Sequence, residues 1–127
     1  MIPNFFMHKK IRYHCIMNPN KEFLSGTLRT IILALLKENG RMYGYEICKL
    51  TKELTDGEVM LTEGAIYPAL HKLEKQGLIN SSKEMVNGRT RKYYSIKAAQ
   101  AESIEQQISF LLRFSNHLNT LLNPKKI

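Results

Sequence analysis

The segment from Thr62 to Gln76 gathers side chains that can bind nucleic acid on one face of an expected helix. The apolar residues that recur at helical spacing are Ile66, Ala69, Leu70 and Leu73. Thr62 is the predicted N-cap and Gly77 the stop. The opposite face carries hydroxyl, imidazole and ammonium groups suited to base edges and phosphates: Tyr67, His71, Lys72 and Lys75. We therefore expect this face, with Thr62 and Glu63 at its start, to contact DNA, although an exposed helical His71 is more often plain polar surface.

A hairpin is predicted directly after this helix. The runs 78–86 and 89–96 flank Asn87-Gly88, a strong signal for a two-residue type I′ turn, because both turn residues must take positive φ. The expected cross-strand pairs are Val86 with Arg89, Glu84 with Arg91, Ser82 with Tyr93, and Ile79 with Ile96. Alternation then divides the side chains into an inner face with Ile79, Tyr94 and Ile96 and an outer face with Arg89, Arg91 and Tyr93.

The cations of the hairpin tip, Arg89, Arg91 and Lys92, are expected to reach DNA phosphates. The alternative is that they only keep a protruding hairpin soluble. Their position next to the helix at 62–76 favours the first interpretation.

Two helices are predicted upstream to position this unit. The first has an apolar stripe and ends near Asn39-Gly40, with Asn18-Pro19 as its expected cap; the stripe residues are Leu24, Leu28, Ile31, Ile32, Leu35 and Leu36. The second runs from Tyr43 to Leu54 and ends at Asp56-Gly57, with an inner stripe of Ile47, Leu50, Thr51 and Leu54. A short extended strand is expected at 58–61. This order predicts a mainly α fold with a small β-hairpin, the winged helix-turn-helix.

The last predicted helix, at about 98–122, carries a heptad seam three repeats long: Ala101, Ile104, Ile108, Leu111, Ser115, Leu118 and Leu122. Phe110, Leu112, Phe114 and Leu121 widen the stripe. A helix of about 25 residues is roughly 37 Å long, which exceeds what one small domain can cover. The seam therefore predicts a homodimer, with folding back onto its own domain as the alternative. The expected organisation is an N-terminal extension at 1–17, a DNA-binding domain at 18–97, a dimerisation helix at 98–122 and a tail at 123–127.

Composition agrees with a polyanionic partner. The chain of 127 residues is 43% hydrophobic and 24% charged, which fits one domain, and its net charge of +8 with a pI near 9.6 favours phosphates. The apolar run from Ile31 to Leu36 is too short to cross a membrane, and the first sixteen residues lack a secretory signal pattern. A cytoplasmic protein is expected. Cys15 and Cys48 form no CxxC pair, and we expect no disulfide between them.

No constellation in the sequence predicts catalysis, a metal site or another cofactor. The histidines lack the spacing of metal ligands: His8, His14, His71 and His117. There is no phosphate-binding glycine loop. Glu102 and Glu105 lie three apart on the last helix, where such a pair is far more often solvated surface than an acid-base pair.

Several segments, in order, closely resemble the PadR family of bacterial transcriptional regulators over about residues 18 to 122. They are the runs 21–36 and 43–47 (Tyr-Gly-Tyr-Glu-Ile), the Ile-Tyr-Pro-x-Leu helix within 64–79, and the Arg-Lys-Tyr-Tyr strand within 89–94. The resemblance implies a homodimeric repressor that binds a palindromic operator and in many members releases DNA when a small molecule binds. The single short C-terminal helix is similar to the smaller subfamily. Aromatic acids, drugs and other amphipathic toxins are the effectors it implies.

Carried over by motif, Tyr67 resembles the family's recognition-helix tyrosine, Arg91 and Lys92 its wing cations, and Tyr43 and Tyr45 the aromatics of its second helix. This chain departs from the family pattern after the last strand, where Ile96-Lys97 stands in place of Leu-Thr and no Gly precedes Ala101. The start and angle of the last helix are therefore open.

Residues 1–16 lie outside the resemblance, because Met17 would be a normal family start, and they are either an upstream extension of the reading frame or a basic arm. Without their three cations Lys9, Lys10 and Arg12 the net charge would fall from +8 to +5.

The function predicted is a DNA-binding transcriptional repressor acting on a double-stranded operator as a homodimer. The rival from another class is a winged-helix module that binds protein, whose wing would be apolar or acidic; single-stranded RNA binding would need aromatic platforms on a larger sheet. A small hydrophobic or aromatic effector is expected between the C-terminal helices, near Phe23, Ile108, Leu111 and Phe114, with Met17 as a further wall. The alternative is that these residues pack together and leave no cavity.

Overall fold

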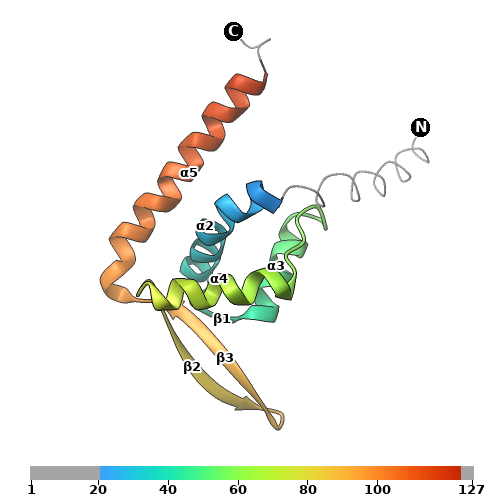
Figure 1. The fold of residues 1–127 in the computed structure, drawn as a ribbon, viewed down its shortest axis with the longest axis vertical. Helices are drawn as coiled ribbons and strands as arrows, with labels where there is room; N and C mark the ends of the chain where they lie inside the picture. The colour runs from blue at the N-terminus through green and yellow to red at the C-terminus, as the bar shows by residue number, and fades with distance from the viewer. Residues whose placement is uncertain (1–20, 124–127) are drawn as a thin grey trace, which may run out of the picture.

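A helical body carries two projecting elements, a β-hairpin and a long C-terminal helix, which leave it in different directions (Figure 1). The computed structural model describes residues 21–123. Its elements are α2 Lys21–Asn39, β1 Arg41–Tyr43, α3 Gly44–Leu54, α4 Glu63–Lys75, β2 Ile79–Val86, β3 Arg89–Ile96, a 3-10 turn η1 at Ala98–Gln100, and α5 Ala101–Leu122. The expected fold class is confirmed: mainly α with a small antiparallel sheet, a winged helix-turn-helix and a long last helix. The predictions for Met17, Cys15, Asn18-Pro19 and the basic arm lie outside the described residues.

The core lies where α2, α3, α4 and the base of the hairpin meet. Its fully buried side chains are Ile32, Leu33, Leu36, Ile47, Ile66, Leu70, Leu73, Ile79 and Ile104. Burying one such side chain contributes about 1.5–3 kcal/mol, so this set accounts for much of the stability of the domain. The apolar stripe of α2 is shifted from the expected one, because Leu33 is buried whereas Ile31 is only partly so. Gly40, at φ 85°, ends this helix as expected.

The sheet has three antiparallel strands in the order β1-β3-β2. The predicted hairpin register is confirmed at each of the four expected pairs, from Val86 opposite Arg89 to Ile79 opposite Ile96. Asn87 and Gly88 take φ of 49° and 78°, as a type I′ turn requires. We call the β2–β3 hairpin the wing.

The prediction of a short extended strand at 58–61 was wrong. The third strand is β1, which precedes α3 and pairs with β3 through Met42 opposite Tyr94. The loop before α4 instead turns on itself, because Asp56 and Gly57 both take positive φ and the Gly57 N–H donates to the Lys52 carbonyl at 2.8 Å. Leu61 from this loop is buried in the core.

The inner stripe predicted for α3 holds at Ile47 and Thr51, which are buried, and Leu50 packs partly against the core. It was wrong at Leu54, which is 66% exposed. Leu54 is the last residue of the helix, and the backbone of the next residue, Thr55, is no longer helical.

The first turns of α5 pack on their own domain rather than standing free. Ile104 is 1% exposed and Ile108 packs against the core, while Lys37 of α2 forms an ion pair with Glu105 at 2.7 Å. The assignment of Ile104 to a subunit interface was therefore wrong. The 3–4 spacing of apolar residues that predicts a seam between two chains also allows a helix to pack against its own domain. The rest of α5 runs away from the body (Figure 1) and exposes Phe110, Leu112, Phe114, Leu121 and Leu122.

Candidate DNA interface

The helix α4 presents a polar outer face held in place by a buried inner one. Thr62 caps it as predicted, with its hydroxyl oxygen accepting the Ala65 N–H at 3.2 Å. Ile66, Leu70 and Leu73 are buried. All six residues expected on the reading side of this helix are exposed: Thr62, Glu63, Tyr67, His71, Lys72 and Lys75. Exposure alone does not make them equivalent, because their side chains have different neighbours.

Tyr67 lies across the start of α3. A Cβ atom placed on Gly44 would be 2.5 Å from Cε1 of Tyr67 and 2.9 Å from its hydroxyl oxygen, so the ring rests directly on the backbone of Gly44. Burial raises the pKa of the Tyr67 hydroxyl above its usual value, yet the residue remains 42% exposed. Tyr67 therefore has two roles open to it: it spaces α4 from α3, and it offers a hydroxyl at the surface.

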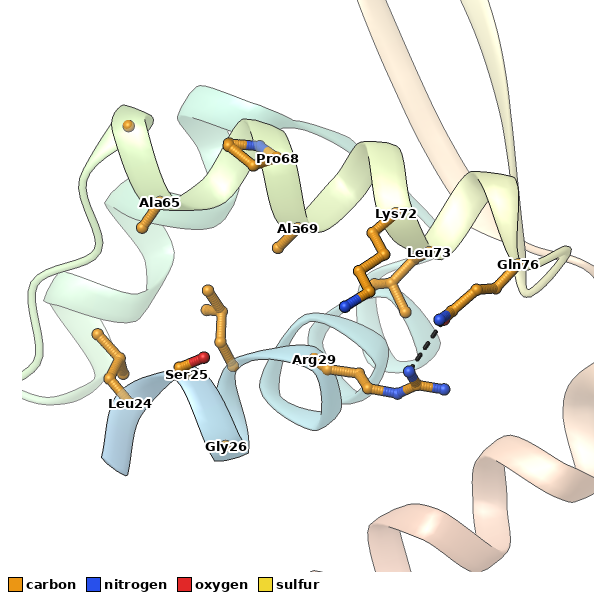
Figure 2. Close-up of a pocket in the computed structure, with 12 residues that line it drawn as sticks. Leu24, Ser25, Gly26, Arg29, Ala65, Pro68, Ala69, Lys72, Leu73 and Gln76 are labelled. Atoms are coloured by element: carbon orange, nitrogen blue, oxygen red, sulfur yellow. Dashed lines mark hydrogen bonds between the residues drawn. The ribbon is translucent and has the colours of Figure 1, made fainter. Parts of the chain in front are cut away.

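Lys72 points toward α2 rather than away from the domain. Figure 2 shows its side chain crossing the gap between α4 and α2, beside Arg29 and Gln76. The Arg29 guanidinium donates to the Gln76 side-chain oxygen at 2.9 Å and joins the two helices. These side chains stand at one end of a groove of about 730 Å³ that lies between α2 and α4. Lys72 thus lies on the flank of the expected reading face, and His71 and Lys75 remain exposed elsewhere on the same helix.

The outer face of the wing joins an aromatic cluster at the start of α3. The Tyr43 ring meets the Tyr93 ring edge-on at 5.3 Å and stacks on Tyr45 at 6.3 Å. The Arg91 guanidinium lies over the Tyr43 ring at 4.6 Å. Tyr43 is the N-cap of α3, and its N–H donates to the Glu46 carboxylate at 3.1 Å. The wing cation Arg91 and the first turn of α3 are therefore held together as one surface.

Lys92 lies on the other face of the wing from Arg91. It pairs with Glu74 of α4 at 3.4 Å and sits 5.6 Å from the centre of the Tyr94 ring. Glu74 also accepts a hydrogen bond from the Ser81 hydroxyl at 2.5 Å, and this bond, with the nearby Lys92, lowers the pKa of the Glu74 carboxyl. Sequence reasoning grouped Lys92 with Arg89 and Arg91, but the structure makes it a link between wing and α4.

Arg41 and its partner Glu84 belong to this surface, although the sequence did not predict a role for either. Arg41 of β1 pairs with Glu84 of β2 at 2.5 Å and lies over the Tyr93 ring at 4.0 Å, so it braces the wing across the intervening strand. The available signal was the polar-apolar-polar triplet Arg41-Met42-Tyr43 between two glycines. Among the described residues, Arg89 and Arg91 are the wing arginines that make no ion pair, whereas Arg41 is neutralised.

Within residues 21–123 no group of three or more metal-ligand side chains lies close enough to hold an ion. No helix in the same range is both long and apolar enough to cross a membrane.

Burial raises the pKa of the Cys48 thiol on α3 above its usual value.

A three-helix body with an arginine-bearing wing beside an exposed polar helix is a winged-helix DNA-binding domain. The model of the PadR-like family of transcriptional regulators matches residues 32–106, and the chain belongs to this family. It is 35% identical over 74 residues to the transcriptional regulator Rv3488 of Mycobacterium tuberculosis; this match covers 58% of the chain but only 65% of that relative.

Solved structures give the same assignment. A transcriptional regulator from Clostridium thermocellum matches with a TM-score of 0.68 and 32% identity over 79% of this chain and 97% of that one. A PadR-like regulator from Bacillus cereus matches with a TM-score of 0.66 and 29% identity, covering 80% of this chain and 97% of that one. In agreement with the sequence, the family and these relatives are transcriptional regulators rather than enzymes.

Proposed function

We propose that this regulator is a repressor that binds a palindromic operator in the cytoplasm as a homodimer. The outer face of α4 would enter the major groove, and the wing and the first turn of α3 would hold the flanking phosphates. The observation that carries this proposal is the stacking of Arg91 over Tyr43 at 4.6 Å, because it fixes a wing cation beside the start of α3. A stacked guanidinium keeps its N–H groups along its edge, where they can meet phosphate oxygens.

The roles of individual residues follow from their neighbours. Arg89 and Arg91, without ion pairs, would contact phosphates together with Lys75. His71 and the Tyr67 hydroxyl would meet base edges or their flanking phosphates. Lys92 would act through Glu74 by fixing the angle of the wing, and its own phosphate contact would be weaker than that of Arg91.

Dimerisation is supported by the exposed apolar side of α5. Phe110 and Phe114 stack with parallel rings at 6.4 Å, yet they are 61% and 45% exposed. Leu121 and Leu122 at the end of the helix are 71% and 77% exposed. Contiguous apolar surface of this kind marks an interaction site. We propose that a second copy covers it, with Leu111 and Leu118 in the seam, Ser115 beside them and Ala101 at its edge.

A hydrophobic or aromatic effector between the two α5 helices remains part of this proposal. Leu111 and Phe114 stand on the free part of α5 and could line such a site. Ile108 is already packed against the core of its own chain, so it would contribute little. The side chain of Phe23 lies outside the described set.

Selection of binding sites from a pool of random duplexes tests the proposed function. We expect the recovered sites to share two inverted half-sites whose centres are about one DNA turn, roughly 34 Å, apart or a multiple of it. Recovery of no common sequence, together with no binding to random DNA at modest salt, would favour the protein-binding module instead.

A further inference from the structure

The chain contains two Asn-Gly dipeptides, Asn39-Gly40 at the end of α2 and Asn87-Gly88 at the tip of the wing. In such a dipeptide the asparagine side chain can lose ammonia with little hindrance, because glycine has no side chain to block the approach of its own backbone nitrogen. All four residues are exposed, so access to water does not distinguish the two sites. Their hydrogen bonds do.

Hydrogen bonds hold both reacting groups of Asn39-Gly40. The Gly40 N–H donates to the Leu36 carbonyl at 2.9 Å, and the Asn39 side-chain amide donates to the Leu35 carbonyl at 2.8 Å. Loss of ammonia requires the glycine nitrogen to turn toward the side-chain carbonyl carbon of the asparagine before it. At the end of α2 this movement would break both bonds and unwind the last turn of the helix, so the structure protects Asn39.

The reacting groups at the wing tip are not held in this way. Within residues 21–123 the Asn87 side chain and the Gly88 N–H have no hydrogen-bond partner, and the tip lies at the end of the wing far from the helical body (Figure 1). Asn87 has φ 49°. Type I′ and type II′ turns both need positive φ at this residue and differ by a flip of the central peptide. That flip turns the Gly88 nitrogen toward the Asn87 side chain while the strands keep their register.

We propose that Asn87 is a site of spontaneous deamidation, which lowers the DNA affinity of this regulator as the protein ages. The Gly88 nitrogen attacks the side-chain carbonyl carbon of Asn87, loses its proton and displaces ammonia, which leaves a cyclic succinimide. Water opens the ring at either carbonyl and gives aspartate or isoaspartate, so an amide and a water become a carboxylate and an ammonium ion. Arg89, which makes no ion pair among the described residues, favours the negative charge that develops on the Gly88 nitrogen.

Either product changes the part of the wing that would meet DNA. The new carboxylate stands next to Arg89, repels phosphates and competes with them for the guanidinium. Isoaspartate also carries the main chain through the former side chain, which adds a backbone atom to the turn and disturbs the fit of the two-residue loop to its strands. Both products should weaken binding to any duplex, because phosphate contacts carry no sequence information. This consequence rests on the proposed function, whereas the deamidation itself does not.

Incubation of the folded, DNA-free protein at mildly alkaline pH, followed by peptide mass spectrometry, tests the chemistry. We expect acid to accumulate at Asn87 at least about tenfold faster than at Asn39, because the hydrogen bonds of Asn39-Gly40 must open before it reacts. A sample unfolded in urea gives the intrinsic rates, and there the two sites should react alike. Equal rates at the two sites in the folded protein, or an Asn87 that reacts only in urea, would overturn the proposal.

Asn87→Gly is the matched control for the effect of ageing on DNA binding. A Gly-Gly pair supports the same type I′ turn and has no side-chain amide to lose. Affinity for a random duplex, measured by fluorescence anisotropy, should fall in incubated wild type in step with the fraction converted at Asn87. Asn87→Gly incubated alongside should keep its affinity. Equal losses in the two proteins would mean that other damage weakens binding, and the link between Asn87 and DNA affinity would fail.

Asn87→Asp reproduces one product without incubation, because Asp-Gly also supports the type I′ turn. It should weaken binding to the random duplex about threefold at low salt and less at high salt, as expected for a single exposed charge. Unchanged affinity at low salt would overturn the effect on DNA alone, because the mass measurement does not depend on DNA. Fresh wild type that binds no duplex would instead contradict the proposed function.

Discussion

The ring of Tyr67 rests on the backbone of Gly44, so that the position a Cβ would take on Gly44 is only 2.5 Å from the ring. This contact sets how closely the recognition helix approaches α3. Glycine is required at 44 for space, since Gly44 is not among the glycines at positive φ.

Gly44→Ala should therefore push Tyr67 outward. We expect the free energy of unfolding to fall by about 1 kcal/mol, at the low end of overpacking costs because the ring can move toward solvent. Chemical denaturation measures this in a double-mutant cycle. In a Tyr67→Ala background the same Gly44→Ala change should be neutral or stabilising. Equal costs in the two backgrounds would show that the ring and Gly44 are not coupled.

Tyr67→Phe keeps this packing and removes only the hydroxyl. Operator affinity should weaken by about 1 kcal/mol, the usual value of one hydrogen bond, while the melting temperature stays the same. Fluorescence anisotropy with a labelled operator and a thermal melt give the two numbers. A lower melting temperature with unchanged affinity would assign Tyr67 to packing alone.

Loss of a charge from one face of the wing should change the salt dependence of DNA affinity more than loss of a charge from the other face. Arg91→Ala should lower the slope of log affinity against log salt by about 0.9, as expected for one lost phosphate contact. Lys92→Ala should change this slope less and should weaken the link to Glu74 instead. Affinities measured over a salt series decide the matter, and identical slopes for the two variants would contradict the division of the wing into two faces.

The ionisation of Glu74 should make the free energy of unfolding depend on pH. Its pKa is lowered in the folded protein by the Ser81 hydrogen bond, so its contribution is present above the unfolded pKa of about 4.3 and is lost as pH falls through the lower folded value. Urea unfolding between neutral and acid pH should show this loss in the wild type and a flatter profile in Glu74→Gln. A profile that Glu74→Gln leaves unaltered would mean that this carboxyl is not responsible.

The exposed side of α5 can be tested without disturbing the core. Replacing Phe114 and Leu121 by Lys puts charges into the proposed interface and should dissociate the dimer, at a cost of several kcal/mol. Asn116→Lys adds charge at an exposed position on a different side of the helix and is the control. Sedimentation velocity reports both, and a wild type that is monomeric at all concentrations would rule out the seam.

Signals between neighbouring residues allowed much of the fold and of the candidate DNA interface to be predicted from the sequence. Asn87-Gly88 determined the turn, and the turn determined the register of every pair in the wing. Thr62 marked the start of α4 because capping depends on neighbouring residues only.

Features that depend on distant contacts were less predictable. The strand β1 is three residues long and gains its structure from pairing with β3, which lies about fifty residues away. The pairing of Lys92 with Glu74 depends on how the wing leans on α4. Lys72 points into the groove because α2 packs beside α4, and this packing has no signature in the sequence of α4 itself.

The central claim, that α4 and the wing together read a DNA sequence, is tested most directly by the affinity for the selected operator against a scrambled duplex of the same composition at fixed, near-physiological salt. We expect the operator to bind at least about a thousandfold more tightly, the lower end of specificity ratios for such proteins. We also expect loss of Arg91 to weaken both duplexes alike. Equal affinity for the two duplexes in the wild type would contradict the account, because a face that only attracts phosphates does not read sequence.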